Sequence, residues 1–246
     1  MADVVKLSIV IPAYNEAQRL PATLASIAAT LGPSSTWRPY EVVVVDDASG
    51  DATAAAAAAV VLPGGRMRVL KNRRNRGKGG SIRRGMAAAR GRRLLFTDAD
   101  LSTPLTALER LNAEIEAGAD VAIGSRAVPG AELQARQPWY RELMGKTFNR
   151  LVRILALPGI RDSQCGFKLF TRDAGRRLFR NLTIHGFGFD VEVLFLAHRA
   201  GMAVAEVPVP WRNSLPSKVS PVRDSVRMLV DLIRIRMRHR RDDRRR

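Results

Sequence analysis

The sequence has few of the residues that build cross-links and metal clusters. It holds one cysteine, Cys165, so no disulfide can form within the chain, and a zinc site made of several thiolates is excluded. Its three histidines, His185, His198 and His239, lie far apart without metal-ligand spacing. We interpret them as structural or surface residues. The lone cysteine fits a reducing compartment.

Long apolar runs are also missing. No stretch approaches the roughly 18 uninterrupted apolar residues that a membrane-spanning helix needs. Residues 1–6 include an acid and one lysine, and the apolar run 7–12 is too short for the hydrophobic part of a secretory signal. We therefore expect a protein that is soluble or attached to a membrane surface.

Acidic residues are too few to balance the basic ones. The chain has 41 lysines and arginines against 23 aspartates and glutamates, which gives a net charge of +18. Such a charge attracts nucleic acid, anionic lipid or phosphorylated ligands. No helix-turn-helix, zinc finger or aromatic RNA-binding motif is found. Nucleic-acid binding is therefore the weaker alternative, and no nucleic-acid partner is expected.

Short apolar segments alternate with helix-forming stretches through the first hundred residues. Strands are expected at 7–12, 40–45, 67–70 and 93–97. Helices are expected at 20–31, 51–61 and 81–90. This order predicts an α/β fold with a parallel sheet, right-handed crossovers and helices on both faces. Ligands of such sheets bind beyond the carboxyl ends of the strands.

The second half is expected to begin with a helix and a strand and then to change in character. The expected segments are a helix at 102–117, a strand at 120–125, a mobile loop at 126–137, amphipathic helices at 139–157 and 222–238, and a basic tail at 239–246. Core packing is the usual meaning of an amphipathic stripe. Arginines beside the stripe, with Trp139 and Tyr140 at one end, also suit a membrane interface.

Polar residues follow all four strands expected in the first half. After the fourth come Asp98 and Asp100, whose carboxylates point the same way in an extended loop. Two hard oxygen donors suit Mg²⁺ or Mn²⁺ bridging to a diphosphate, although an aspartate at this place can also cap a helix. Asp47 follows the second strand and can accept hydrogen bonds from a base or ribose, with Tyr14 and Glu16 opposite.

Three further segments have weaker signals. Asp51 is placed to cap its helix. The run 77–80 is rich in glycine but lacks the ending of a P-loop and the last glycine of a dinucleotide fingerprint, so it predicts only a tight turn at a helix start. Arg126 follows the fifth strand, where a guanidinium can hold a phosphate in a bidentate manner.

Together these segments resemble the inverting family 2 glycosyltransferases of the GT-A fold, which implies a mixed, mainly parallel sheet. Within that family they resemble the dolichyl-phosphate β-glucosyltransferases and bacterial polyprenyl-phosphate relatives. The resemblance covers roughly residues 7–238, expected as one domain with a nucleotide-binding half (1–100) and an acceptor and membrane-facing half (101–238). It is carried by 8–16, 45–51, 98–100, 159–172, 189–192 and 217–218, of which 159–172 is the most specific.

The resemblance implies a role for each matching residue. The nucleotide would be bound by Pro12, Tyr14, Glu16, Asp47, Asp98, Ala99 and Lys218. Asp100 would be the main ligand of Mg²⁺ or Mn²⁺, helped by Asp98 and Ser102. Arg126 matches the arginine of the acceptor loop, and Arg212 would face the phosphates with Lys218. Asp100, Arg126 and Arg212 are thus the expected catalytic residues.

The implied reaction moves a hexose from a nucleotide diphosphate sugar to a polyprenyl or dolichyl phosphate with inversion. UDP-glucose is the favoured donor; Trp211 and Arg212 ahead of Lys218 are more similar to the mannosyl-phosphate lipid synthases, which makes GDP-mannose the alternative. A nucleotidyltransferase could share the sheet and the acidic site. Eukaryotic relatives begin with a membrane anchor that has no counterpart here. We therefore expect a cytoplasmic protein, peripheral on the cytoplasmic face of an anionic membrane.

Overall fold

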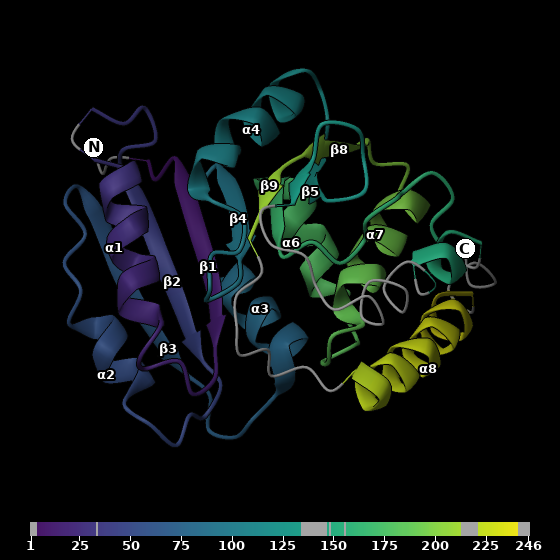
Figure 1. Cartoon of the computed structure of the whole chain (residues 1–246), viewed down its shortest axis with the longest axis horizontal. Coiled ribbons are helices and arrows are strands. Elements are labelled where there is room, and N and C mark those ends of the chain that lie inside the picture. The colour runs from purple at the N-terminus through teal and green to yellow at the C-terminus, as the bar shows by residue number, and fades with distance from the viewer. Residues whose placement is uncertain are drawn as a thin grey trace.

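A seven-stranded sheet forms the centre of the molecule (Figure 1). The computed structural model describes residues 4–32, 34–133, 147, 149–154, 156–212 and 221–240. The strands run in the order β3-β2-β1-β4-β7-β5-β8, and only β7 is antiparallel to its neighbours. Their bounds are β1 Leu7–Ala13, β2 Tyr40–Asp46, β3 Gly65–Lys71, β4 Arg93–Thr97, β5 Val121–Ser125, β7 Phe167–Thr171 and β8 Val204–Pro208. The predicted mixed, mainly parallel sheet is confirmed.

Helices cover both faces of this sheet, as predicted, because the inner strands are apolar on both sides. Along β1, Ile9 and Ile11 face one core cluster while Val10 faces the other. The first cluster is closed by α1 (Leu20–Thr30), α2 (Thr53–Ala58), the short 3₁₀ helix η1 (Leu105–Ala107) and α4 (Leu108–Glu116). The second is closed by α3 (Gly77–Ala88), α6 (Arg172–Arg180) and α7 (Phe189–Arg199).

Three local predictions are wrong in their bounds. Helix α3 begins at Gly77 and not at 81, because Asp47 and Asn75, both outside the helix, accept hydrogen bonds from its first N–H group. The helix expected at 102–117 is split, since Pro104 is extended (ψ 146°) and η1 precedes α4. The loop expected at 126–137 contains strand β6 (Glu132–Leu133), which pairs with β9 (Pro210–Trp211); residues 134–137 lie outside the described part.

The C-terminal helix α8 (Pro221–Arg240) is present, but the apolar side chains of its predicted stripe that the structure describes, from Leu229 onward, do not pack on the core. Leu232 and Ile235 are buried instead, whereas Leu229, Ile233 and Met237 are 39%, 53% and 61% exposed. Most of the helix predicted at 139–157 lies outside the described residues; within it, 149–154 is helical. The expected tail starts later, because α8 continues through residue 240. No helix in the described ranges is long and apolar enough to span a membrane.

Candidate functional site

The loops that follow β1, β2 and β4 meet at the carboxyl edge of the sheet, and each contains a strained residue. Asn15, Ala48 and Leu101 have positive φ values of 54°, 61° and 47°. Such backbone costs about 1–3 kcal/mol per residue and tends to occur at functional sites. The loops also bind one another: the Asn15 N–H donates to Ser49 Oγ (3.0 Å), and the Gly50 N–H donates to Asn15 Oδ1 (2.9 Å).

Asp98 and Asp100 both lie in the loop after β4, close enough for the charge of one to act on the other. Their side chains are 34% and 22% exposed, so both remain reachable from solvent. Burial, and next the charge of Asp98, hold the pKa of Asp100 above its usual value. The loop is attached to α1, because Thr23 Oγ1 donates a hydrogen bond to the Ala99 carbonyl over 2.6 Å. The Ser102 N–H donates to Asp100 Oδ1 (3.1 Å).

This donor set fits a divalent cation that shares its ligands with a substrate. Among the described residues, no group of three or more histidines, cysteines or carboxylates could hold a metal by itself. Mg²⁺ and Mn²⁺ are commonly held by one or two carboxylates with the other positions left to phosphate oxygens and water. Asp98, Asp100 and the Ser102 hydroxyl supply such a partial set. Burial and the charge of Asp98 raise the pKa of Asp100, and a bound cation would offset the repulsion between the two carboxylates.

Gly166 is a site residue that the sequence analysis quoted only as part of a motif. A Cβ at this position would lie 2.1 Å from Asp98 Oδ2, so only glycine leaves room for that carboxylate. The backbone is joined here as well, because the Asp98 N–H donates to the Gly166 carbonyl (3.3 Å). Segment 159–172, the most specific part of the resemblance, thus reaches the acidic pair.

Lys78 is a second residue that the analysis missed. Its Nζ lies 2.7 Å from Asp98 Oδ1. Burial alone would lower the pKa of Lys78, but the charges of Asp98 and Asp190 outweigh it and leave the pKa above its usual value. The signal was a lysine in the glycine-rich segment that begins the helix after an expected strand, which we interpreted only as a turn. Lys78 therefore places a positive charge against the acidic pair.

Arg19, also missed, links a predicted nucleotide residue to the acidic pair. It binds Glu16 with Nε at 2.9 Å and NH2 at 3.2 Å, and its NH1 lies 3.9 Å from Asp100 Oδ2. Tyr14 is 45% exposed at the same edge. Pro12 lies in β1 opposite Val45. The structure thus brings these residues to one edge, while their contacts with a nucleotide stay predictions.

Asp47 is less open than its predicted role implies. It is 4% exposed; its Oδ1 accepts from Asn72 Nδ2 (2.6 Å) and the Arg76 N–H (2.8 Å), and its Oδ2 accepts from the Gly77 N–H (2.8 Å). Asp47 therefore anchors the start of α3, and any bond to a base must use its remaining lone pairs. Asp51 does act near its helix start, accepting from the Thr53 N–H (3.0 Å).

Arg126 already has a bidentate partner within the protein. Its Nε and NH2 donate to the two oxygens of Asp162 over 2.7 and 2.9 Å, and its guanidinium lies over the Trp211 ring at 5.3 Å. Burial alone would raise the pKa of Asp162, but Arg126 outweighs it and holds the pKa below its usual value. The two guanidinium nitrogens of Arg126 that were predicted to bind a phosphate thus bind Asp162 instead.

Arg212 does reach the acidic loop, through its backbone. Its N–H donates to the Ser102 carbonyl over 2.9 Å, which places an exposed arginine next to the predicted metal residues. Lys218 lies outside the described residues. Asp98, Asp100, Ser102 and Arg212 thus form one group. Arg126 is linked to this group through Trp211, the neighbour of Arg212.

Comparison with known proteins gives consistent results. The pattern of the family described as "Glycosyl transferase family 2" matches residues 8–179. Two similar relatives are named "Dolichyl-phosphate beta-glucosyltransferase": one from Drosophila melanogaster is 41% identical over 95% of this chain and 75% of the relative, and one from Dictyostelium discoideum is 37% identical over 96% and 76%.

The solved structure of glucosyl-3-phosphoglycerate synthase from Mycobacterium tuberculosis, in complex with Mn²⁺, uridine diphosphate and its product, superimposes with a TM-score of 0.69. It is 21% identical and covers 93% of this chain and 78% of that one. At this identity the likeness concerns the fold, and it agrees with the GT-A architecture expected from the sequence.

Proposed function

Because the chain belongs to glycosyl transferase family 2, we propose that this glycosyltransferase moves glucose from UDP-glucose to a polyprenyl or dolichyl phosphate with inversion. The observation that carries the proposal is the partly exposed pair Asp98 and Asp100 at the carboxyl edge of the sheet, beside Arg212. The names of the similar relatives support glucose and dolichyl phosphate. The UDP in a structure of the same fold supports the donor.

Asp98, Asp100 and Ser102 would hold Mg²⁺ or Mn²⁺. When bound, the ion would neutralise the charge that develops on the departing nucleoside diphosphate. The protein's part is to fix the two carboxylates: Thr23 holds the loop at Ala99, and Gly166 leaves space for Asp98. Mn²⁺ in the mycobacterial structure supports a divalent ion.

The donor nucleotide would lie across the ends of β1, β2 and β4. Pro12, Tyr14, Glu16, Asp47 and Ala99 are the residues proposed to bind it. Arg19 keeps the Glu16 carboxylate in place through two hydrogen bonds, and Asp47 keeps the start of α3 in place through two. Holding the donor in a fixed orientation is itself a large part of catalysis.

The acceptor phosphate needs no protein base, because a lipid monophosphate is largely anionic at neutral pH and its oxygen can attack directly. Arg212, next to Ser102, is proposed to hold that phosphate near the acidic pair. Arg126, which is paired with Asp162, is proposed to hold Trp211 and the segment around it in position. Lys218 remains a proposed phosphate contact outside the described residues.

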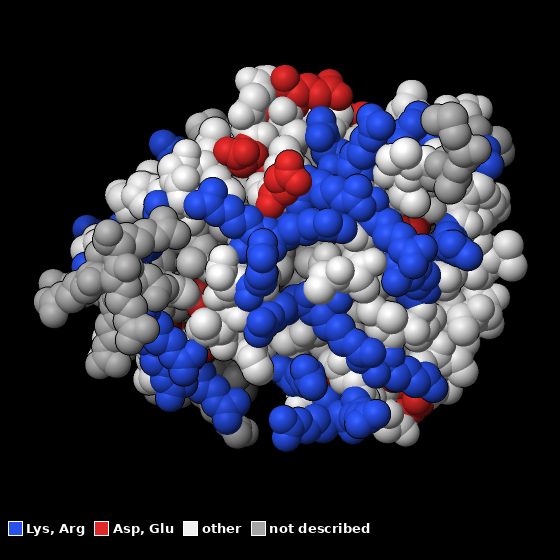
Figure 2. Space-filling model, turned by 180° about the vertical axis from the view of Figure 1, so that it is seen from behind, with Lys and Arg blue, Asp and Glu red and all other residues white. Residues whose placement is uncertain are grey.

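We place the reaction at the cytoplasmic surface of a membrane. Exposed Leu229, Ile233 and Met237 on α8 support this placement, because such side chains on one helix suit the interface of a bilayer. Lysines and arginines also spread over much of the surface on the side opposite to the view of Figure 1 (Figure 2). Each basic group near an anionic bilayer contributes about 1 kcal/mol.

The test is a transfer assay with labelled UDP-glucose, polyprenyl phosphate and Mg²⁺ or Mn²⁺. The wild type should form lipid-linked glucose and release UDP, and Asp100→Ala should lose at least about 100-fold in rate. Asp173→Ala, an exposed acid in the first turn of α6, is the matched control and should stay active. Near-normal transfer by Asp100→Ala refutes the assignment. Better use of GDP-mannose refutes the donor, and pyrophosphate release indicates a nucleotidyltransferase.

A further inference from the structure

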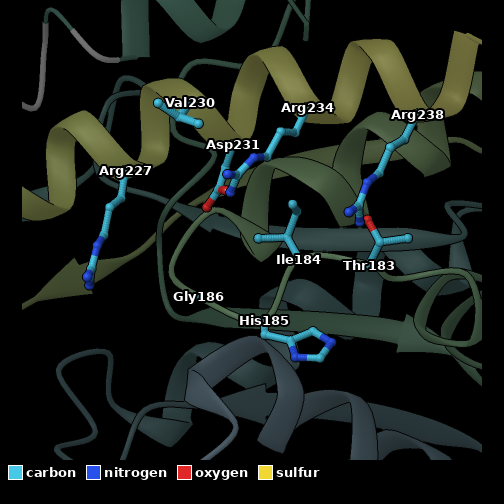
Figure 3. A pocket seen from close by; sticks show the side chains of 9 residues that line it. All are labelled: Thr183, Ile184, His185, Gly186, Arg227, Val230, Asp231, Arg234 and Arg238. Atoms are coloured by element: carbon cyan, nitrogen blue, oxygen red, sulfur yellow. The ribbon is translucent and has the colours of Figure 1, made fainter.

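A basic groove lies beside α8, and none of the residues that line it has been assigned a role in transfer so far. Its volume is about 500 Å³, and it is bounded by α8 and by segment 183–186, which precedes α7. Arg227, Arg234 and Arg238 extend from α8 toward that segment, where His185 and Gly186 form the opposite wall (Figure 3). The spacing of seven and four residues places the arginines on one side of the helix.

The groove has more positive than negative charge. Among the residues that the structure describes, Asp231 is the only acid that lines it, and its Oδ1 pairs with NH1 of Arg234 at 3.3 Å. For Arg227 and Arg238, no carboxylate of the described residues comes within 4.0 Å of the guanidinium. Arg227 interacts with the charge of Asp231 only at longer range. Three guanidinium groups thus face the cavity with one carboxylate, and such an excess is suited to bind a phosphate, because arginine presents several donors in a fixed plane.

The wall opposite α8 is held in place by glycines. The His185 carbonyl accepts a hydrogen bond from the Gly80 N–H of α3 (3.3 Å). On the side of α8, a Cβ at Gly188 would lie 2.8 Å from the Cβ of Asp231. Segment 183–188 therefore lies between α3 and α8 and approaches both closely. The groove is thus built by packing and does not depend on the mobility of surface side chains alone.

Apolar side chains lie next to these arginines on the same helix. Val230, which lines the groove, is 40% exposed, and Leu229, Ile233 and Met237 continue the exposed stripe along α8. A free anion would leave this stripe in water. A ligand with a phosphate group and hydrocarbon chains would satisfy both the arginines and the stripe.

We propose that the groove binds the phosphate headgroup of an anionic membrane lipid, distinct from the acceptor, while the apolar stripe of α8 lies in the adjacent bilayer surface. This deepens the membrane attachment in the proposed function and rests on it. The headgroup would fix the rotation of α8 about its axis at the membrane, and so the orientation of the enzyme.

The experiment measures binding of the full chain to phosphatidylcholine vesicles with and without phosphatidic acid. The variant Arg227→Gln/Arg238→Gln should bind the anionic vesicles at least about tenfold more weakly than wild type, because each arginine accounts for roughly fivefold. The control Arg110→Gln/Arg177→Gln removes the same charge from exposed positions on α4 and α6, away from α8, and should change binding by less than about threefold. Equal losses in both variants would mean general attraction to the basic surface and would overturn the proposal.

A gain-of-binding variant guards against misfolding. Asp231→Asn removes the acid that engages Arg234, so it should bind phosphatidic acid vesicles several-fold more tightly and should melt cooperatively. Unchanged or weaker binding would contradict the assignment. Displacement from the vesicles by inorganic phosphate, at concentrations too low to screen charge, would assign the groove to a free anion. Loss of oligonucleotide binding alone in the double variant would assign it to nucleic acid.

The transfer reaction separates this proposal from the proposed function. With a short-chain polyprenyl phosphate in detergent, Arg227→Gln/Arg238→Gln should transfer glucose at the wild-type rate, because no bilayer is needed. A rate that falls at least about tenfold in detergent would place the arginines in acceptor binding and overturn the headgroup assignment. If the wild type transfers no glucose, the proposed function fails, and the vesicle comparison still decides the groove.

Discussion

Carboxylates at the two ends of the parallel strands differ in burial and in hydrogen bonding. At the amino ends of β1 and β2, Glu41 is 1% exposed and accepts bonds from Ser8 Oγ (2.5 Å), Arg68 NH1 (3.0 Å) and the Arg90 N–H (2.6 Å). At the carboxyl ends, Asp98 and Asp100 remain partly exposed, and the pKa of Asp100 is raised by burial and by its neighbour.

This difference indicates that the carboxylate at the amino ends stabilises the fold, while those at the carboxyl ends are available for a ligand. A fully bonded, buried carboxylate ties three segments together and leaves nothing for a ligand. Two adjacent carboxylates in loops with strained backbone are costly unless a cation joins them. In parallel α/β sheets ligands bind at the carboxyl edge, and here this is where the partly exposed carboxylates lie. Substitutions at the two ends should therefore have opposite consequences.

The largest effect is expected at the amino end. Glu41→Ala should lower the free energy of unfolding by about 3 kcal/mol, because it leaves Ser8 and Arg68 without their buried partner. Urea unfolding measures this change. The exposed Glu114→Ala should be neutral. The folded fraction of the Glu41 variant should still transfer sugar, and a specific loss of transfer in well-folded protein would break the comparison.

At the carboxyl end, Gly166→Ala should reduce transfer with less effect on folding. The added Cβ would lie 2.1 Å from Asp98 Oδ2 and must displace that carboxylate. A misplacement of about 1 Å can cost up to about 100-fold in rate. The control is Gly50→Ala, on the same edge, where a Cβ meets no atom within 4 Å. Kinetics with UDP-glucose compare the two, and equal rates would show that the position of Asp98 is not critical.

Lys78→Met should increase the repulsion between Asp98 and Asp100, because it removes the positive charge next to Asp98. Without the ammonium at 2.7 Å from Asp98, the variant should be less stable, by about 1 kcal/mol. Mn²⁺ should then raise the Tm of the variant by several degrees more than that of the wild type, as thermal melts with and without the ion measure. The same Mn²⁺ shift in both proteins would mean that the lysine and the ion do not share Asp98.

The smallest effect concerns pH. The pKa of Asp100 is raised in the fold, so its ionised form opposes folding at neutral pH, and this cost disappears as the pH falls below the ordinary pKa of 3.8. Asp100→Asn should therefore stabilise the protein by roughly 0.5 kcal/mol at neutral pH. The gain should shrink toward pH 4. A gain that grows on acidification would contradict the raised pKa.

The sequence predicted which residues lie at the carboxyl edge of the sheet better than it predicted the hydrogen bonds between them. Buried parallel strands are continuous apolar runs in the sequence. The ends of these runs therefore predicted that Asp47 and Asp98 lie at the carboxyl edge of the sheet. The early start of α3 could not, because Asp47 accepts its Gly77 N–H across 30 residues of chain. The same holds for Arg126, whose partner Asp162 lies 36 residues away.

Strand β7 escaped prediction for a related reason. Lys168 interrupts its apolar pattern, yet the side chain is 0% exposed. Its Nζ finds Asp190 at 2.5 Å and the Cys165 carbonyl at 2.7 Å, partners that only the folded chain supplies. On α8 the arginines and apolar residues were recognised, but which stripe faces the core depends on the packing of Leu232 and Ile235 against α7 and its neighbours.

Calorimetric titration with UDP, in the presence and absence of Mn²⁺, tests the central claim most directly. If Asp98 and Asp100 hold a cation against the diphosphate, Mn²⁺ should tighten UDP binding to the wild type at least about tenfold and should have no effect on Asp98→Ala/Asp100→Ala. Equal enhancement by Mn²⁺ in both proteins would contradict the account.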